Sequence, residues 1–249
     1  MTTRKSLQCQ LILGSIILFG CLTLLHTPAY PQGYIAGQLG VSIPGSLSNV
    51  DVTSQLIGNP PMPTPPGTQF SDFDLHNSFL IGAKAGYFSR SIRWFGVEAE
   101  VFHTTPHVKQ QPVTTTLGSG FIWSDTGTPT SNPIISPGLS FRMITLAPLN
   151  LVFRYPGHRL QPYVAVGPGI FLARLKQLGD SQSSTKLGLN SQVGLRYFMS
   201  RHWALFGEYK FNYVRLDFKE TNVGRPIGLD GFDATYIAHN FVFGVGYHF

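Results

Sequence analysis

The sequence predicts an all-β protein: a closed, eight-stranded antiparallel transmembrane β-barrel with short turns at one end and long loops at the other. Three observations predict it. Eight segments alternate apolar residues with small or polar ones, which is the period-two pattern of a strand. Short and long connections alternate between these segments. Only 12% of the residues are charged and 27 are glycine, which suits a sheet facing lipid better than a soluble domain with a charged coat.

The eight predicted strands cover residues 33–43, 78–89, 93–103, 139–155, 160–175, 186–199, 202–218 and 235–249. Each has one apolar face, for example Ile35, Leu39, Val41 and Ile43 in the first. Tight turns are predicted near Ser91, at 156–159 and at 200–201, and longer polar loops at 44–77, 104–138, 176–185 and 219–233. Short periplasmic turns on the side of both termini, with long extracellular loops opposite, are typical of outer-membrane barrels.

The last segment has the clearest pattern. From Phe241 onward the odd positions are large and apolar, while Asn240, Gly244 and His248 interrupt the other parity. The sequence ends on Phe249, whose ring is apolar although its carboxylate must stay solvated. A bilayer interface supplies both environments within a short distance, so this strand predicts a membrane protein.

The first 29 residues have the features of a secretory signal. A basic start and an apolar run over 11–25 precede an A-x-A-like site at 27–29. We therefore expect a cleaved signal peptide, 1–29, and a barrel domain, 30–249. A membrane-anchoring helix is one alternative, but it would require about 18 or more apolar residues. Lipidation of Cys21 is another, because residues 18–21 look like a lipoprotein box.

Composition excludes several classes of site. Cys9 and Cys21 both lie in the signal segment, so the rest of the chain has no thiol for a disulfide, a nucleophile or a metal ligand. The net charge is +6, and the basic residues are scattered along the chain rather than clustered. We therefore expect no nucleic-acid partner. Beyond the signal, no apolar stretch is long enough for a spanning helix. A membrane protein of this sequence must be a closed barrel, because an open sheet would leave unpaired backbone groups in lipid.

The parity opposite the apolar faces carries the charges. They are Lys84, Glu98, Glu100, Arg142, Arg154, Arg196, Glu208 and Lys210. A lipocalin-like soluble barrel, the alternative with the same strand count, would have to bury either these charges or the apolar set. A barrel in lipid turns the charges inward, where they persist only when paired. We therefore expect a lumen charge network, with Lys84 facing Glu98 and with Arg196 and Glu208 as diagonal neighbours.

Four stretches carry a family resemblance: 161–167 (QPYVAVG), 194–198 (GLRYF), 205–209 (LFGEY) and 244–249 (GVGYHF). On them the chain resembles the small eight-stranded outer-membrane proteins of the OmpA/OmpX and opacity-protein type. The resemblance implies an outer-membrane location, contact with outer-membrane lipids, and recognition of the last strand by the barrel assembly machinery through Gly244, Tyr247 and Phe249. It implies almost nothing about activity.

Catalytic and metal-binding patterns are weak in this sequence. Some barrels of this size modify lipid A acyl chains, which requires a nucleophile with a base or a histidine with polar partners. The candidates are His103, His107 and His239, with Ser119 or Ser140. Nothing in the spacing fixes a partner for any of them, and we expect no enzyme. The nearest approach to a metal site, Asp72 and Asp74 with His76, is better interpreted as an exposed acidic loop, so we expect no metal or cofactor.

Three functions remain open at this point. The first is a structural or surface-interaction role, in which the extracellular loops contact a ligand or a host surface. The second is a narrow pore or a channel for small apolar molecules. The third is a lipid A-modifying enzyme. The first is favoured, because crossed ion pairs would plug an eight-stranded barrel, whose interior is just wide enough to be filled by side chains.

Overall fold

The computed structural model describes residues 32–52, 56–57, 62–63, 69–70, 72–109, 111–113, 115–116, 134–136, 140–157, 159–177, 180–218 and 232–249. The predicted signal segment 1–29, with Cys21, lies outside the described residues. So do Ser119 and most of the predicted loops 104–138 and 219–233. Within the described ranges, no helix is long and apolar enough to cross a membrane.

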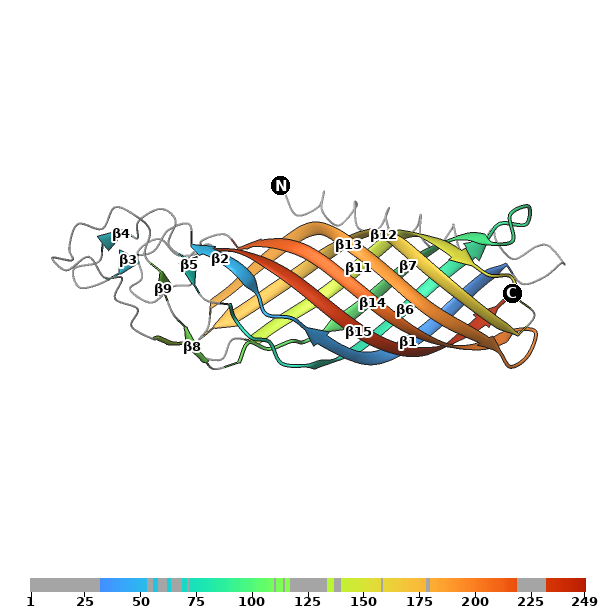
Figure 1. Cartoon of the computed structure of the whole chain (residues 1–249), viewed down its shortest axis with the longest axis horizontal. Helices are drawn as coiled ribbons and strands as arrows, with labels where there is room; N and C mark the ends of the chain where they lie inside the picture. The colour runs from blue at the N-terminus through green and yellow to red at the C-terminus, as the bar shows by residue number, and fades with distance from the viewer. Residues whose placement is uncertain are drawn as a thin grey trace, which may run out of the picture.

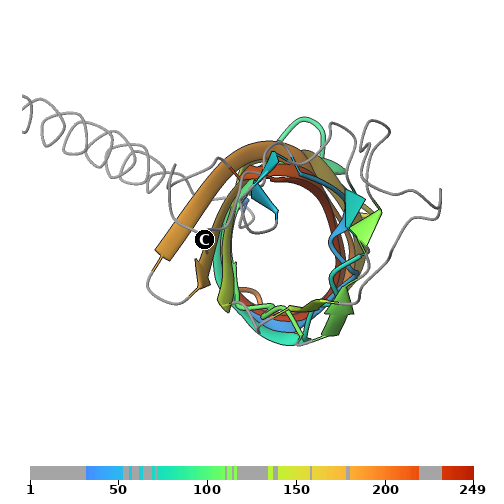
Figure 2. The ribbon, with the colours of Figure 1, turned by 90° about the vertical axis from the view of Figure 1, so that its left-hand side faces the viewer.

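Eight long strands form a closed antiparallel barrel, which confirms the predicted fold (Figures 1 and 2). They are β1 (Gly33–Pro44), β6 (Ser78–Phe88), β7 (Phe95–Thr104), β11 (Ser140–Arg154), β12 (Leu160–Gln177), β13 (Asp180–Phe198), β14 (Trp203–Phe218) and β15 (Phe232–His248). Each pairs with the next, and β15 pairs back with β1 from Tyr34↔His248 to Pro44↔Ala238. Closure removes the free sheet edges, which a lipid environment does not tolerate.

The outer face of the barrel is apolar. Phe79 is 86% exposed, Leu187 74% and Leu39 67%, and most of the other large apolar side chains of the strands also point outward. The alternate positions point inward, among them Lys84 and Lys210, which are buried. An apolar surface this extensive fits a lipid environment and would be an aggregation hazard in water. The apolar parity of the sequence therefore faces outward and the charged parity faces the lumen, as a barrel in lipid requires.

The two ends of the barrel differ. At one end β6–β7, β11–β12 and β13–β14 are joined by short turns, such as the one closed by Ser89 N donating to Phe95 O at 3.0 Å. The described chain also begins and finishes there, since Gln32 N donates to Phe249 O at 3.1 Å. We call this the turn end, at the right in Figure 1, and the opposite end the loop end.

The predicted loop at 176–185 is mostly strand, which corrects the sequence interpretation. Strands β12 and β13 pair as far as Gln177↔Asp180. Beyond Gly188↔Val214, β13 leaves β14, so this hairpin continues past the barrel wall. Its outward side chains include Arg174, Lys176, Ser181 and Ser183. This polar run predicts a loop because the apolar alternation stops there. The strand continues because its inner parity is still buried.

A bulge in β11 overturns the prediction that Arg142 points into the lumen. The pairing of β11 with β7 runs through Ala147↔Glu100 and then Asn150↔Glu98, so β11 contains one extra residue. Pro148 lies in this extra segment, where its missing N–H costs no ladder hydrogen bond. The insertion reverses the side-chain parity. Asn150 and Arg154 therefore keep the inward parity, whereas Arg142, on the other side of the bulge, is exposed on the outer face.

The hairpin between β6 and β7 is offset from the predicted register. Lys84 lies opposite Glu100, and Glu98 lies opposite Gly86. The prediction centred the turn on Ser91, whereas the pairing places its centre one residue later. A one-residue move of the centre shifts the partner of Lys84 by two positions and keeps every side chain on its predicted face.

Short strands attach the loop bases to the loop end. Strand β2 (Ser48–Val52) pairs with β15, β5 (Gln69–Phe70) with β2, and β9 (Thr115–Thr116) with β5. Two further pairs join β3 (Leu56–Ile57) to β4 (Met62–Pro63) and β8 (Gln111–Val113) to β10 (Ile134–Ser136). Single bridges, Leu47↔Phe73 and Leu75↔Val108, complete the attachment. The first two loop-end connections are therefore tied to the barrel at their bases.

Candidate functional site: a layered barrel lumen

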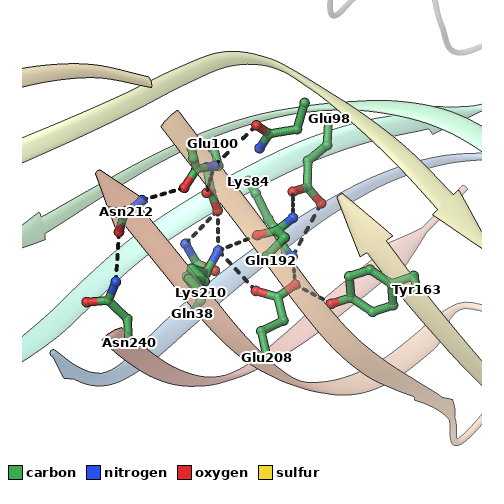
Figure 3. A network of polar contacts seen from close by, with 12 residues as sticks. Gln38, Lys84, Glu98, Glu100, Tyr163, Gln192, Glu208, Lys210, Asn212 and Asn240 are labelled. Carbon is green, nitrogen blue, oxygen red and sulfur yellow. Dashed lines mark hydrogen bonds and ion pairs between the residues drawn. The ribbon is translucent and has the colours of Figure 1, made fainter. Parts of the chain in front are cut away.

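A layer of charge fills the lumen near its middle (Figure 3). Lys84 from β6, Glu98 and Glu100 from β7, and Glu208 and Lys210 from β14 meet there, because β14 lies across the barrel from β6 and β7. Lys84 Nζ lies 3.3 Å from Glu98 Oε2 and also contacts Glu208. Lys210 Nζ lies 3.0 Å from Glu208 Oε2 and also contacts Glu100. All five side chains are completely buried.

Neutral polar groups complete this charged layer. The hydroxyls of Tyr34 and Tyr163 donate to Glu98 and Glu208, respectively. Gln192 links the two halves, because its amide donates to Glu98 at 2.6 Å and its carbonyl accepts from Lys210 at 2.8 Å. An unpaired buried charge would cost several kcal/mol, so the extra hydrogen bonds are what make this burial tolerable.

The two tyrosines belong to this network although they are not among the predicted lumen residues. The same holds for Gln38, which donates to Glu100 at 3.3 Å. All three share the inward parity of the charges. That parity was the available signal, but it does not say which residues meet across the lumen.

A belt of four asparagines lies next to the charged layer. Asn240 donates to Asn212 and Asn212 to Asn190, both at 2.7 Å, and Asn190 donates to Asn150 at 3.2 Å. Asn190 also donates to Glu100 at 2.9 Å, which joins the belt to the charges. The step from β13 to β11 passes β12 at Gly167, where a Cβ would come within 2.5 Å of Asn150 Oδ1. A glycine is needed there for the belt to cross the intervening strand.

The layer nearest the turn end is aromatic and cationic. The Arg196 guanidinium lies 4.5 Å from the ring centroid of Tyr34 and 5.0 Å from that of Tyr163, and Arg154 lies 3.6 Å from that of Phe88. Such cation–π contacts stabilise a desolvated guanidinium. Phe206 lies opposite Arg196 and Gly194 opposite Glu208, so these two charges occupy the predicted diagonal register. Among the described residues, however, the ion pairs of Glu208 are with the two lysines.

The layer nearest the loop end is apolar. Its buried residues come from four barrel strands and from the loop bases: Leu47, Val50, Leu75, Val108, Phe141, Met143, Phe171, Ala173, Leu175, Val214, Leu216, Phe218, Ala234, Tyr236 and Ala238, with Phe73 packed against them. The lumen parity is therefore not uniformly polar. Where the loops close over the barrel, side chains of that parity form a hydrophobic core.

The middle layer holds three carboxylates and two lysines, and Arg196 of the adjacent turn-end layer supplies the third positive charge. Counted with Arg196, the charges balance. A neutral, fully buried network offers a passing ion no unpaired site to exchange with. This arrangement can hold strands in register and block the lumen, and it displays no reactive group to solvent.

The catalytic candidates do not come together in the described part of the chain. His103 Nδ1 contacts the carbonyl of Met143 at 3.0 Å, and His239 Nδ1 lies 2.6 Å from the Tyr209 hydroxyl on the outward parity of β14 and β15. His107 is exposed, and Ser140 is half-buried where β11 begins. Asp72 Oδ2 accepts from Ser46 at 3.2 Å, and no group of three potential metal ligands occurs among the described residues.

The predicted assembly residues lie at the turn end or on the approach to it. Gly244 packs against the Phe206 ring, where a Cβ would come within 2.2 Å of Cζ. Tyr247 makes an edge contact with Trp203 at 5.2 Å between ring centroids. Phe249 N donates to Gly33 O at 2.9 Å, and the residue is 38% exposed. Exposed aromatic rings at one end of a strand set resemble the interfacial girdle of a membrane barrel.

Comparisons with known proteins agree with this architecture. Residues 17–249 match the family model described as the outer membrane protein beta-barrel domain. No curated protein sequence matches the chain.

Solved structures with a similar fold include three from bacterial outer membranes. Neisserial surface protein A has a TM-score of 0.51 at 12% identity, covering 87% of this chain and 97% of that one. The outer membrane protein OprG of Pseudomonas aeruginosa has 0.52 at 14%, covering 89% and 98%. The outer membrane protease OmpT of Escherichia coli has 0.48 at 9%, covering 90% and 99%. The likenesses to neisserial surface protein A and to OprG show the fold alone.

Proposed function

This chain belongs to the outer membrane protein β-barrel family, and on that premise we propose that it is a sealed, non-enzymatic scaffold that presents its loops to a ligand or host surface outside the cell. The observation that carries the proposal is the balanced, fully buried charge layer across the lumen. An eight-stranded barrel has room for little else at that height. A lumen filled in this way leaves the loop end as the part of the molecule available for interaction.

The loop bases support this proposal. Leu47, Leu75 and Val108 are buried in the apolar layer, and β2 extends the sheet from β15. Binding loops function best when a rigid scaffold positions them, because less conformational entropy is lost on binding. The first two loop-end connections meet this condition at their bases.

Conductance through planar bilayers tests whether the lumen is sealed. We expect no ion steps from the wild-type protein. The matched control is a Glu100→Ala/Lys210→Ala double variant, which removes one charge of each sign and two large side chains from the same layer. We expect that variant to conduct weakly. Regular conductance steps from the wild-type protein would contradict a sealed scaffold and favour the narrow-pore alternative.

Protease added to intact cells tests which end faces outward. Cleavage within 53–71 or 110–133 without cell lysis would support presentation of the loops outside the cell. Cleavage at these positions only after lysis would reverse the orientation and remove the proposed role. A mutant lacking the protein should meanwhile show unchanged lipid A acyl chains by mass spectrometry, and altered acylation would favour the enzyme alternative.

We further propose that the barrel assembly machinery recognises the last strand through Gly244, Tyr247 and Phe249. Deletion of Phe249 should lower the outer-membrane level of the protein, measured as the heat-modifiable band in membrane fractions. Phe249→Tyr, which keeps an aromatic ring and the backbone hydrogen bonds, is the control and should assemble normally. Normal assembly of the truncated chain would contradict this recognition.

A further inference from the structure

Three cations gather on the outer face of the barrel at the loop end. Arg142 lies on β11 and Arg174 and Lys176 lie on β12, and all three are exposed. The two arginines are direct cross-strand partners, and Lys176 pairs with Ser140 at the next outward position. Like charges directly opposite each other on neighbouring strands repel. The fold therefore holds an unfavourable charge arrangement at this place.

The described part of the chain does not neutralise this cationic cluster. No ion pair joins any of the three residues to a described carboxylate, and Arg174 Nη2 donates only to Ser181 Oγ at 3.4 Å. Lys186, on the same hairpin, has the opposite arrangement and pairs with Asp217 at 2.9 Å. The two lumen lysines are likewise paired with carboxylates. The described residues therefore leave this cluster open to an anion from outside the chain.

The position of the cluster indicates what compensates it. The outward pair one step nearer the turn end is Ile144↔Leu172, and the outer face continues apolar as far as Phe153 on β11. One residue between 144 and 153 is the bulge, so eight regular steps of about 3.3 Å at a tilt of about 40° rise roughly 20 Å. This is close to the apolar band of about 25 Å that outer-membrane barrels present to lipid. The cluster thus lies where the hydrocarbon ends and the lipid headgroups begin.

We propose that Arg142, Arg174 and Lys176 bind the phosphate of a lipid headgroup in the leaflet at the loop end. A phosphate between the two guanidiniums can accept two N–H···O hydrogen bonds from each of them, and its negative charge offsets their repulsion. Lys176 adds a third positive charge. Ser181 and Ser183 are exposed on the adjacent strand and opposite Lys176 and Arg174, so their hydroxyls can donate to the remaining oxygens. The bound lipid would be held against β11 and β12 at the point where the hairpin leaves the barrel wall.

Unfolding by urea in lipid vesicles of two compositions tests this site. The probes are phosphatidylcholine vesicles, which carry no net charge, and the same vesicles containing phosphatidic acid, a phosphate monoester. Phosphatidic acid should raise the unfolding midpoint of the wild-type protein, and the Arg142→Gln/Arg174→Gln variant should lose most of that increase. In phosphatidylcholine alone, Arg174→Gln should unfold at a higher urea concentration than wild type, because it relieves the repulsion. This reversal of sign between the two lipids is specific to a bound phosphate.

Arg215 provides the matched control. It is exposed at the same end on β14, but its cross-strand partner is Thr235 rather than a cation. Arg215→Gln should keep the full response to phosphatidic acid. An equal loss in Arg215→Gln would reduce the effect to net charge and overturn the site, as would a full response in the double variant. Equal stabilisation of the wild-type protein in phosphatidylcholine by millimolar inorganic phosphate would overturn the headgroup as the ligand.

Discussion

Two layers of the same lumen, both formed by inward-pointing side chains of the barrel strands, are filled by opposite chemistry. The middle layer contains buried ions such as Lys84 and Glu208, and the loop-end layer contains apolar residues such as Phe171 and Val214. On β14 the two layers are only a few residues apart, with Lys210 and Asn212 preceding Val214 and Leu216. The difference shows that facing the lumen does not by itself fix a polarity. The polarity of a layer depends on the segments that pack against it along the barrel axis.

Each layer suits its position. In the described part of the chain, no loop residue packs against the middle layer. The barrel's own side chains fill the lumen there, and hydrogen-bonded ions also specify which strands meet. The loop-end layer receives Leu47, Leu75 and Val108 from the loop bases, so apolar burial both excludes water and anchors these segments. The first layer therefore depends on exact pairing, whereas the second depends on volume. The following predictions test that distinction.

The largest effect is expected from breaking the charge balance of the middle layer. Lys210→Met leaves Glu100 and Glu208 short of a cation and should cost about 3–5 kcal/mol in unfolding free energy. Adding Glu100→Gln restores the balance and should recover much of that loss, a coupling of about 0.5–3 kcal/mol. Reversible urea unfolding in lipid vesicles measures both values. Strictly additive effects would mean that the two residues do not act as a pair.

In the loop-end layer, truncation should act through lost volume alone. Leu175→Ala leaves a cavity among buried apolar side chains and should cost about 2–5 kcal/mol. Its effect should add to that of Lys210→Met and should not change with salt, because no charge is involved. Unfolding of both single variants and the double variant at two salt concentrations provides the measurement. Strong coupling would show that the two layers are one cooperative unit.

The outer face supplies a contrast with both layers. Val193→Arg on β13, close in height to the charged layer, should destabilise the barrel by about 2–4 kcal/mol, because it places a charge in the lipid midplane. The same change at Leu195, two residues nearer the turn end, should cost less. Vesicle unfolding of the two variants tests the gradient. Tolerance of arginine at Val193 would mean that this face does not contact hydrocarbon.

The smallest effect is expected at the asparagine belt. Gly167→Ala brings a methyl group within 2.1 Å of Leu149 O and 2.5 Å of Asn150 Oδ1, so the strand or the belt must shift. Overpacking of this kind costs about 1–3 kcal/mol. Gly37→Ala, where nothing lies within 4 Å of the added Cβ, is the control and should be nearly neutral. A neutral Gly167→Ala variant would show that the belt does not need to cross β12 at this point.

The sequence by itself determined the features that depend on local alternation. The parity of Ile35 against Tyr34, or of Val193 against Gln192, follows from the period of two, because successive side chains on a strand point to opposite faces. The closed eight-stranded fold followed from the number of such segments and from the need to satisfy every backbone group in lipid. Most of the residues assigned to the lumen could be selected in the same way.

Only the tertiary structure decided which of these residues meet. The Pro148 bulge reverses parity within one strand and places Arg142 outside, although the proline was a visible signal of a break in the ladder. The contacts of Glu208 with Lys84 and of Lys210 with Glu100 join strands that are neighbours neither in the sequence nor in the sheet. Such contacts depend on barrel closure and on the register of every intervening pair. Closure and register depend on interactions between residues that are far apart in the sequence, and a local pattern does not contain that information.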